Sequence, residues 1–287
     1  MTPTASPVWP APAKLNLFLH VVGRRADGYH ELQSCFQFVD LCDEIRIEVR
    51  PDGRIHRLTE VAGVPEAADL CVRAAKALKA ASDSPWGADL SVLKRIPMGA
   101  GLGGGSSDAA TCLVALNDLW KLHWSVDDLA ALGLKLGADV PVFVRGRAAW
   151  AEGIGERLTP LHPPLAPKET NYLIIKPNIG VSTVDVFTDP ELTRNSPPIT
   201  IHGFLTAGGR NDCLGVVRRR YPEVARALDW LSAFGPARLT GTGACVFLDC
   251  ETVERGREIL RQVPPAFDAF LVRGLNDSPL LERLATG

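Results

Sequence analysis

The 287-residue sequence lacks a surplus of charge of either sign, because 31 lysine and arginine residues stand against 33 aspartate and glutamate residues. A formal net charge of −2 gives no electrostatic reason to expect nucleic acid as a partner. Long apolar runs are missing too, since none approaches the roughly 18 residues that a membrane-spanning helix needs. We therefore expect neither a nucleic-acid nor a membrane partner.

Cysteine pairs of the kind that hold metals or disulfides are also absent. The seven cysteines are odd in number and include no Cys-x-x-Cys pair. Most lie in apolar runs, as buried small hydrophobic residues do, and a disulfide framework is unusual in a chain of this size. Residues 1–13 show neither the basic nor the apolar segment of a secretory signal. These absences predict a cytoplasmic protein.

The strands and helices that the sequence does predict are mixed in order. Alternating apolar residues predict strands, at residues 13–22, 32–39, 44–49, 88–96, 172–175, 244–248 and 267–273. Helical spacing predicts helices, at residues 68–81, 109–120, 125–137, 211–220, 222–234 and 253–263. Residues 140–150 read as extended, and the prolines of residues 159–170 mark a linker. Without strict strand–helix alternation, the pattern favours an α+β fold.

A glycine-rich stretch at residues 97–110 is the most informative part of the sequence. It reads PMGAGLGGGSSDAA, with five glycines among seven residues, between a predicted strand and a predicted helix that Ser106 or Ser107 can cap. Glycines let backbone N–H groups converge, and a helix N-terminus adds partial positive charge, so this is a candidate phosphate site. The two serine hydroxyls could hold phosphate oxygens or a metal ion. A flexible glycine hinge is the alternative.

Two known phosphate motifs do not explain this loop. Gly99, Gly101 and Gly104 match the spacing of a dinucleotide-binding fingerprint, but that fold needs a strand after the helix, and a second helix follows instead. A Walker A loop is excluded because no Gly-Lys-Ser/Thr follows at the required spacing. If the loop binds phosphate, it therefore belongs to another class of phosphate site.

Three weaker features would fit a phosphoryl-transfer site. Lys14 and Asn16 project from one face of the first predicted strand, although an exposed strand lysine is usually only solvated. Asp139 enters an apolar segment, either as a capping or turn residue or as a general base. Residues 240–244, Thr-Gly-Thr-Gly-Ala, could close over phosphates or form an ordinary turn.

Taken together, these motifs resemble one family. The order Pro12-Ala13-Lys14-Leu15-Asn16-Leu17, Gly28-Tyr29-His30-Glu31-Leu32, the loop at 97–110, Gly137-Ala138-Asp139-Val140-Pro141-Val142-Phe143 and Leu239-Thr240-Gly241-Thr242-Gly243 is similar to that of the GHMP kinase superfamily. The resemblance runs from about residue 9 to 283. It implies a two-lobed α+β fold, with an N-terminal lobe at 1–158 that carries the glycine loop and a ferredoxin-like C-terminal lobe at 159–287.

The same resemblance implies a reaction. The Ala-Lys-Leu-Asn-Leu, Gly-Tyr-His and Gly-Ala-Asp-Val-Pro elements narrow it to ATP-dependent phosphorylation of the 2-hydroxyl of 4-diphosphocytidyl-2-C-methyl-D-erythritol, in the non-mevalonate isoprenoid route. The lack of a transit-like leader favours a bacterial source. Asp139 would be the base, and Lys14 would neutralise charge on the moving phosphoryl group. ATP and Mg²⁺ are the implied cofactors, with the metal ligands and the oligomeric state left open.

Binding residues follow by the same resemblance. The loop would hold ATP through Pro97, Gly99, Gly101, Leu102, Gly103, Gly104, Gly105, Ser106 and Ser107. The substrate, which carries a cytidine diphosphate group, would contact Asn16, Tyr29, His30, Thr183, Phe187, Gly241, Thr242 and Gly243. Among these, Tyr29 and Phe187 would stack on the cytosine, and His30 would read its edge.

Two residues depart from the family's usual pattern, and two alternative functions remain open. Asp69 stands where the family usually has asparagine, which puts a nucleotide contact there in doubt, and Thr242 replaces a frequent serine. The first rival is another GHMP kinase, acting on mevalonate, homoserine or a sugar. The second is a catalytically silent nucleotide-binding regulator, which would have no need of both Lys14 and Asp139.

Overall fold

The computed structural model describes residues 7–286. The first six residues, which belong to the expected N-terminal lobe and to the segment without a signal pattern, lie outside this range, as does Gly287. The strands are β1 (Val8–Arg24), β2 (His30–Arg50), β3 (Ile55–Arg57), β4 (Gly87–Leu93), β5 (Ala149–Glu152), β6 (Arg157–Pro160), β7 (Asn171–Pro177), β8 (Arg238–Leu239), β9 (Val246–Asp249) and β10 (Phe267–Leu275). The helices are α1 (Leu70–Ser82), α2 (Gly104–Leu119), α3 (Val126–Leu134), α4 (Val140–Arg145), α5 (Thr183–Thr188), α6 (Ile201–Ala207), α7 (Leu214–Arg220), α8 (Pro222–Ser232), α9 (Val253–Leu260) and α10 (Pro279–Ala285). The mixture confirms the α+β class.

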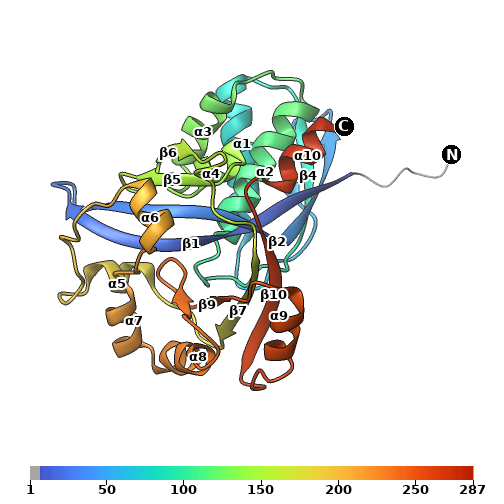
Figure 1. Cartoon of the computed structure of the whole chain (residues 1–287). Helices are drawn as coiled ribbons and strands as arrows, with labels where there is room; N and C mark the ends of the chain where they lie inside the picture. Colours follow the sequence, from blue (N-terminus) through green and yellow to red (C-terminus); the bar gives the residue numbers. More distant parts are fainter. Residues whose placement is uncertain (1–6, 287) are drawn as a thin grey trace.

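Strands β1 and β2 form a long hairpin that crosses the molecule (Figure 1). β2 also pairs with β4, β5 and β10, so it connects the sheet of the first half to that of the second. We expected two strands, at 32–39 and 44–49, but β2 is continuous. The acidic residues between them do not break it, because the Asp43 carboxylate is buried and accepts the backbone N–H groups of Arg95 and Ile96 at 2.5 and 2.8 Å.

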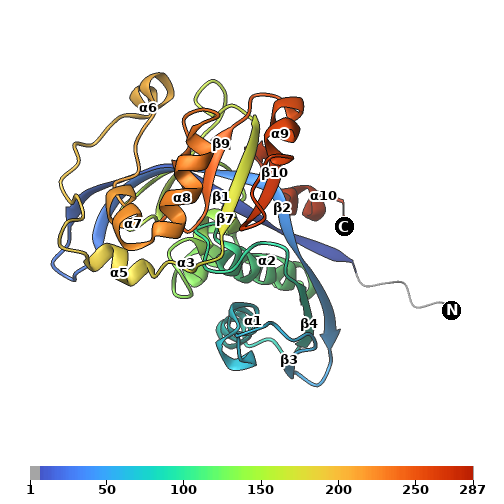
Figure 2. The same cartoon turned by 90° about the horizontal axis from the view of Figure 1, so that it is seen from below.

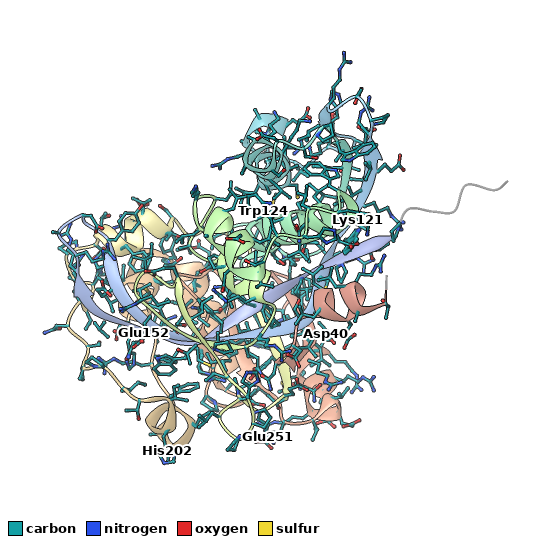
Figure 3. All side chains as sticks on the ribbon, turned by 90° about the horizontal axis from the view of Figure 1, so that it is seen from above. Asp40, Lys121, Trp124, Glu152, His202 and Glu251 are labelled. Carbon is teal, nitrogen blue, oxygen red and sulfur yellow. The ribbon has the colours of Figure 1, made fainter. Side chains whose placement is uncertain are left out.

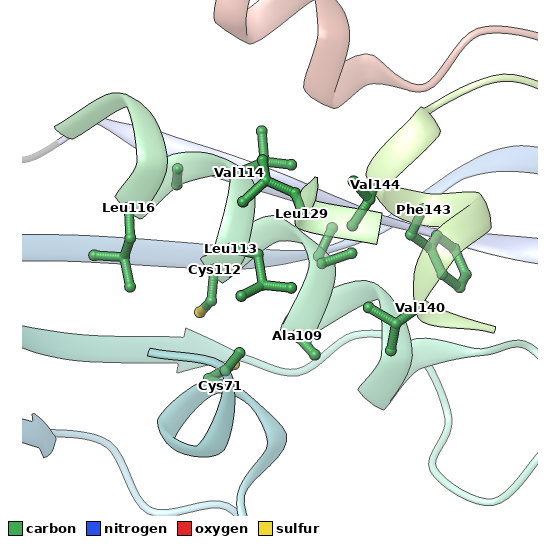
Figure 4. Packing of buried hydrophobic residues seen from close by; sticks show 14 of the residues in the cluster. Cys71, Ala109, Cys112, Leu113, Val114, Leu116, Leu129, Val140, Phe143 and Val144 are labelled. Carbon is green, nitrogen blue, oxygen red and sulfur yellow. The ribbon is translucent and has the colours of Figure 1, made fainter. Parts of the chain in front are cut away.

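Helices α1 to α4 cover this part of the sheet and hold the glycine loop at one end of α2. Figure 4 shows Cys112 and Leu113 of α2 packed between Cys71 of α1 and Val140 of α4, and all four are fully buried or nearly so. Burying a large apolar side chain stabilises a fold by about 1.5–3 kcal/mol. The α2 N-terminus, which follows the loop directly, is therefore fixed by the core.

The second half has the ferredoxin-like topology predicted for it. Its sheet has the strand order β10-β7-β9-β8, with every pair antiparallel. Helices α8 and α9 pack on one face of this sheet (Figure 2). In chain order the elements run strand, helices, two strands, helix and strand, which is a split β-α-β unit.

Some local expectations are wrong. Residues 140–145 form helix α4 rather than a strand, since Pro141 stands in the first helical turn, where proline is favoured. Ser106 and Ser107 lie inside α2 and do not cap it; the N-cap is Gly103, without a side-chain hydrogen bond. Helix α10 was not expected, and its Leu280 packs in the core of the first half. Among residues 7–286 no helix is long and apolar enough to cross a membrane.

Candidate active site

Strand β1 places Lys14 and Asn16 side by side, as the alternation predicted. Lys14 Nζ donates to Asn16 Oδ1 at 2.5 Å, and Asn16 Nδ2 donates to Ser34 Oγ at 2.8 Å. The backbone N–H of Asn16 donates to Thr240 Oγ1 at 3.0 Å. Lys14 is only 3% exposed, so its ammonium is held by protein groups such as Asn16 Oδ1 and not by water, while Ser34 and Thr240 hold Asn16 in place.

The carboxylate nearest to this ammonium is Asp139, with 3.3 Å between Lys14 Nζ and Asp139 Oδ2. Asp139 occupies the N-cap position of α4, but its side chain makes no capping hydrogen bond and stays 33% exposed. The carbonyl of Gly101 also accepts from Lys14 Nζ at 3.4 Å. The predicted pair of Lys14 and Asp139 is therefore formed. Both residues line one cavity, and the carboxylate is the more exposed of the two groups.

The glycine loop needs glycine at two positions for steric reasons. Gly101 has φ +78°, and a Cβ there would lie 2.4 Å from the carbonyl oxygen of Thr240. Gly103 has φ +74°, and a Cβ there would lie 2.8 Å from the ring of Phe143. An L-residue with a side chain rarely adopts such φ values. Close approach of the 240–243 turn and of α4 thus dictates these glycines, and the flexible-hinge alternative does not account for them.

A cavity of about 410 Å³, here called the loop pocket, lies between the glycine loop, β4 and the start of α1. No side chain caps the N-terminus of α2, so its first backbone N–H groups remain available to an anion. Seven of the nine predicted ATP contacts line it: Pro97, Gly99, Gly101, Gly103, Gly104, Gly105 and Ser106. Leu102 and Ser107 are buried and do not line this cavity.

A charged cluster at the floor of the loop pocket was missed by sequence reasoning. Lys94 Nζ contacts Asp43 and lies 2.5 Å from Asp108 Oδ2. Burial raises the pKa of Asp108 to about 7; Lys94 opposes this rise and Asp43 adds to it. Asp69, where the family usually has asparagine, also lines the pocket, but its carboxylate caps α1 through Cys71 N at 2.7 Å and pairs with Arg57. No spacing in the sequence links these distant residues.

A second cavity of about 320 Å³, the lysine pocket, contains Lys14, Asn16 and Asp139. It also includes Thr183, Phe187, Gly241 and Thr242, four of the predicted substrate contacts. Thr183 and Thr242 are hydrogen-bonded through their hydroxyls at 3.0 Å. Gly101, Gly103 and Ser106 line both pockets, so the two cavities meet at the glycine loop. A phosphoryl group carried in one can therefore face an acceptor in the other.

The far end of the lysine pocket is built differently from the expected aromatic sandwich. The rings of His30 and Phe187 stack with centroids 5.3 Å apart. Tyr29 is 62% exposed at the hairpin tip, and it does not line the pocket. Two further predicted substrate contacts, His30 and Gly243, are not among the lining residues either. Burial lowers the pKa of His30, with Arg194 and Arg24 adding to the effect.

Arg194 is a further residue that sequence reasoning missed. Its Nε donates to His30 Nε2 at 3.1 Å, and its Nη2 donates to the carbonyls of Phe187 and Asp189 at 3.1 and 2.7 Å. Arg194 thereby fixes the His30 ring to the end of α5. It lies in a proline-rich stretch without periodicity, so no sequence signal could have identified it.

The structure thus has a glycine loop at a helix N-terminus beside a buried lysine and a partly exposed aspartate, the arrangement that the resemblance to GHMP kinases implied. Models of the GHMP kinases N terminal domain and the GHMP kinases C terminal match residues 69–147 and 200–269. The chain belongs to the GHMP kinase family, whose members are ATP-dependent phosphotransferases.

Its relatives indicate which member it resembles. Over 277 residues, covering 96% of this chain and 97% of the relative, it is 54% identical to the 4-diphosphocytidyl-2-C-methyl-D-erythritol kinase of Pseudomonas aeruginosa strain LESB58. The counterpart from Pseudomonas paraeruginosa is also 54% identical, with the same coverage. A crystal structure of 4-(cytidine 5'-diphospho)-2C-methyl-D-erythritol kinase superposes with a TM-score of 0.80 at 33% identity, covering 93% of this chain and 99% of that one. A Methanococcus jannaschii mevalonate kinase, at 17% identity and a TM-score of 0.70 over 96% and 100% of the two chains, shares the fold.

Proposed function

We propose that this kinase transfers the γ-phosphate of ATP to the 2-hydroxyl of 4-diphosphocytidyl-2-C-methyl-D-erythritol, a step of the non-mevalonate isoprenoid route. The observation that carries the proposal is the Lys14–Asp139 pair, 3.3 Å apart, beside the glycine loop that lines both cavities. The names of the 54% identical relatives supply the acceptor.

Asp139 acts as the base in this proposal. Its carboxylate is exposed toward the lysine pocket and makes no capping hydrogen bond, so it is free to accept the proton of a bound hydroxyl. Lys14 neutralises charge on the phosphoryl group as it moves between the cavities. Phosphoryl transfer depends more on positioning and charge neutralisation than on covalent help, and a pre-built pair supplies both.

The loop pocket holds ATP in this proposal, with the phosphates against the backbone of residues 99–105 and the N-terminus of α2. The described residues contain no group of three or more His, Cys, Asp or Glu side chains that could hold a metal alone. Mg²⁺ seldom needs one, since it binds through few protein oxygens together with substrate phosphates. The Ser106 hydroxyl lines both cavities and fits such a site. Mg²⁺ held there by Ser106 and ATP would neutralise phosphate charge.

The substrate's cytosine would bind at the Phe187 end of the lysine pocket. Phe187 already offers one ring face, and His30 is held against it by Arg194. We assign Tyr29 the second face, which it reaches when the hairpin tip closes over the base. The hydroxyls of Thr183 and Thr242 and the backbone of Gly241 and Gly243 would contact the remainder of the substrate, with Asn16 orienting the methylerythritol part.

We also propose that the chain forms two lobes, residues 1–158 and 159–287, and that the protein is cytoplasmic. All seven cysteines are free, which suits a reducing cytoplasm. The partner is a small molecule, and net charge gives no reason to add nucleic acid or membrane to it.

A coupled ADP-release assay over a substrate panel tests the proposal. 4-Diphosphocytidyl-2-C-methyl-D-erythritol should be phosphorylated with Mg²⁺ present, while kcat/KM for mevalonate and homoserine should be at least ~100-fold lower, about 2.7 kcal/mol of discrimination. Comparable turnover of mevalonate would instead assign the chain to another GHMP reaction. Absence of ADP release with every substrate would support the silent regulator.

A further inference from the structure

A hollow of about 840 Å³ lies away from the loop and lysine pockets, and the proposed reaction does not use it. It is formed by His20, the segment after α6, and residues around β8, β9 and the first turn of α9. Three arginines line it, Arg210, Arg238 and Arg255, so we call it the arginine hollow. Its volume falls within the range of ligand pockets, about 300–1,000 Å³.

Arg238 is the first residue of the arginine hollow that needs a partner. Its guanidinium lies 4.6 Å from the centroid of the Phe247 ring and donates to the carbonyl of Leu17 at 3.3 Å. Within residues 7–286 no carboxylate lies within ion-pair distance of it, and the Asp249 carboxylate in the same hollow favours its charge only from farther away. Burial lowers the pKa of Arg238, which means that its surroundings disfavour the positive charge. Asp249 balances this partly buried charge only in part, and an anion bound in contact with the guanidinium would stabilise it further.

His20 is the second such residue. It is 6% exposed, lines the arginine hollow, and neither ring nitrogen has a hydrogen-bond partner among the described residues. Buried polar side chains are nearly always hydrogen-bonded, so two orphaned nitrogens call for an explanation. An acceptor oxygen of a bound ligand would provide a partner that the protein does not.

The acidic residues of the arginine hollow indicate which chemical groups its ligand would carry. Asp249 Oδ1 already accepts from Thr170 Oγ1 at 2.7 Å and from the N–H of Glu251 at 2.9 Å. Glu251, labelled in Figure 3, lies 3.7 Å from Arg255 through Oε1. Arg210 is already paired with Asp212 at 2.7 Å, so the anionic group of a ligand would meet Arg238 and the loosely paired Arg255. The two lining carboxylates favour a ligand that also carries hydrogen-bond donors such as hydroxyls.

The arginine hollow is connected to the lysine pocket through the backbone. Leu19 lines the lysine pocket and the next residue, His20, lines the hollow, because successive strand side chains point to opposite faces. The N–H of Leu19 donates to the carbonyl of Arg210 at 3.0 Å. Asn211 Nδ2 donates to the carbonyls of Leu239 and Gly241 at 2.9 and 2.8 Å. The segments that carry the arginines therefore also support the proposed substrate contacts.

We propose that the arginine hollow is a second binding site, for a small phosphorylated metabolite bearing hydroxyl groups. Its phosphate is held by Arg238 and Arg255 with His20, and its hydroxyls face Asp249 and Glu251. Arginine suits this role because its planar fork matches phosphate oxygens. The site is separate from the one that binds ATP.

Calorimetric titration of the full chain tests this site, with the glycine loop first saturated by a non-hydrolysable ATP analogue. The probes are glycerol 3-phosphate, inorganic phosphate and glycerol. Glycerol 3-phosphate should bind more tightly than phosphate, and glycerol should not bind. Arg238→Gln and Arg255→Gln should each weaken glycerol 3-phosphate binding by about tenfold or more, since hydrogen bonds to charged groups are the strong ones. Arg226→Gln, an exposed arginine on α8, is the matched control and should bind as wild type does.

Arg255→Gln protects the test against misfolding, because this side chain is 41% exposed and forms no part of the proposed catalytic site, so kinase activity should stay normal. The His20 ring signals in an NMR spectrum should shift with glycerol 3-phosphate in wild type and in Arg226→Gln. The proposal is overturned if no phosphate probe binds wild type up to about 10 mM, if glycerol binds as well as glycerol 3-phosphate, or if Arg255→Gln binds unchanged.

Discussion

The two ends of the lysine pocket are built to different degrees. At the glycine-loop end, Lys14, Asn16 and Thr240 are joined by hydrogen bonds, and the backbone of Gly101 is packed against the carbonyl of Thr240. At the hairpin end, Tyr29 is exposed and only the His30–Phe187 stack is formed. The groups proposed for chemistry are therefore placed by the fold itself, whereas the groups proposed for base recognition are only partly assembled.

The largest expected effect is at the chemical end. Asp139→Asn keeps the size of the side chain but removes its ability to accept a proton, so kcat should fall by roughly 10²–10⁴. Substrate Kd and the melting temperature should change little, because no cavity is created. Kinetics, a binding titration and a thermal melt measure the three quantities.

Asp118→Asn is the matched control for this substitution, since Asp118 is an exposed partner of Lys121 on α2. It should leave kcat unchanged. An Asp139→Asn enzyme with near-normal kcat and a lowered melting temperature would return Asp139 to a purely structural role.

The next effect separates two glycines of the same loop. Both Gly99 and Gly101 have positive φ, +63° and +78°, but a Cβ at Gly99 meets nothing within 4 Å, while one at Gly101 lies 2.4 Å from a backbone oxygen. Gly99→Ala should therefore cost only the conformational penalty, about 1–2 kcal/mol of unfolding free energy. Gly101→Ala should cost more and should weaken ATP binding. Urea unfolding of both variants measures the difference between their unfolding free energies. An equal loss in both variants would show that the turn at 240–243 moves to make room for a Cβ at residue 101.

At the open end, Phe187→Ala should weaken substrate binding by roughly 5- to 150-fold, because stacking of a base on a ring is worth ~1–3 kcal/mol. ATP affinity should barely change. His30→Ala should reduce the preference for cytidine over uridine analogues, since His30 is proposed to read the base edge. Titration of each variant with substrate and with an ATP analogue checks this, and equal losses for both ligands would mean that Phe187 is only a packing residue.

The smallest effect is a pH dependence of stability at the loop pocket. Burial raises the folded-state pKa of Asp108 from 3.8 to about 7, so the folded protein keeps a proton that the unfolded chain releases. Stability from this group is therefore lost as pH rises from about 4 to about 7. The melting temperature of wild type should fall relative to Asp108→Asn over this interval, by roughly 2–4 °C per kcal/mol. A difference that stays constant with pH would contradict the assignment.

Some parts of the fold and the candidate site could be predicted from the sequence, and others could not. Lys14 and Asn16 were placed correctly on one face because strand alternation is local, and the glycine loop was located by its composition. The Lys94–Asp43–Asp108 cluster and the role of Arg194 depend on contacts between residues far apart in the chain, for which one sequence holds no signal. The continuity of β2 through residues 40–43 could not be predicted either, because the buried Asp43 carboxylate is satisfied by backbone N–H groups of the distant residues Arg95 and Ile96.

Hydrogen–deuterium exchange of the apo enzyme and of its substrate complex most directly tests whether the glycine-loop end of the lysine pocket is preformed and the hairpin end is not. The backbone amides of residues 13–17 should be protected in the apo enzyme and should change little on binding, because their side chains are already placed. Amides of the hairpin tip, residues 25–30, should become more protected when substrate binds, as Tyr29 closes over the base. Equal gains of protection at both ends would contradict a preformed chemical centre, and no gain at the tip would contradict closure over the cytosine.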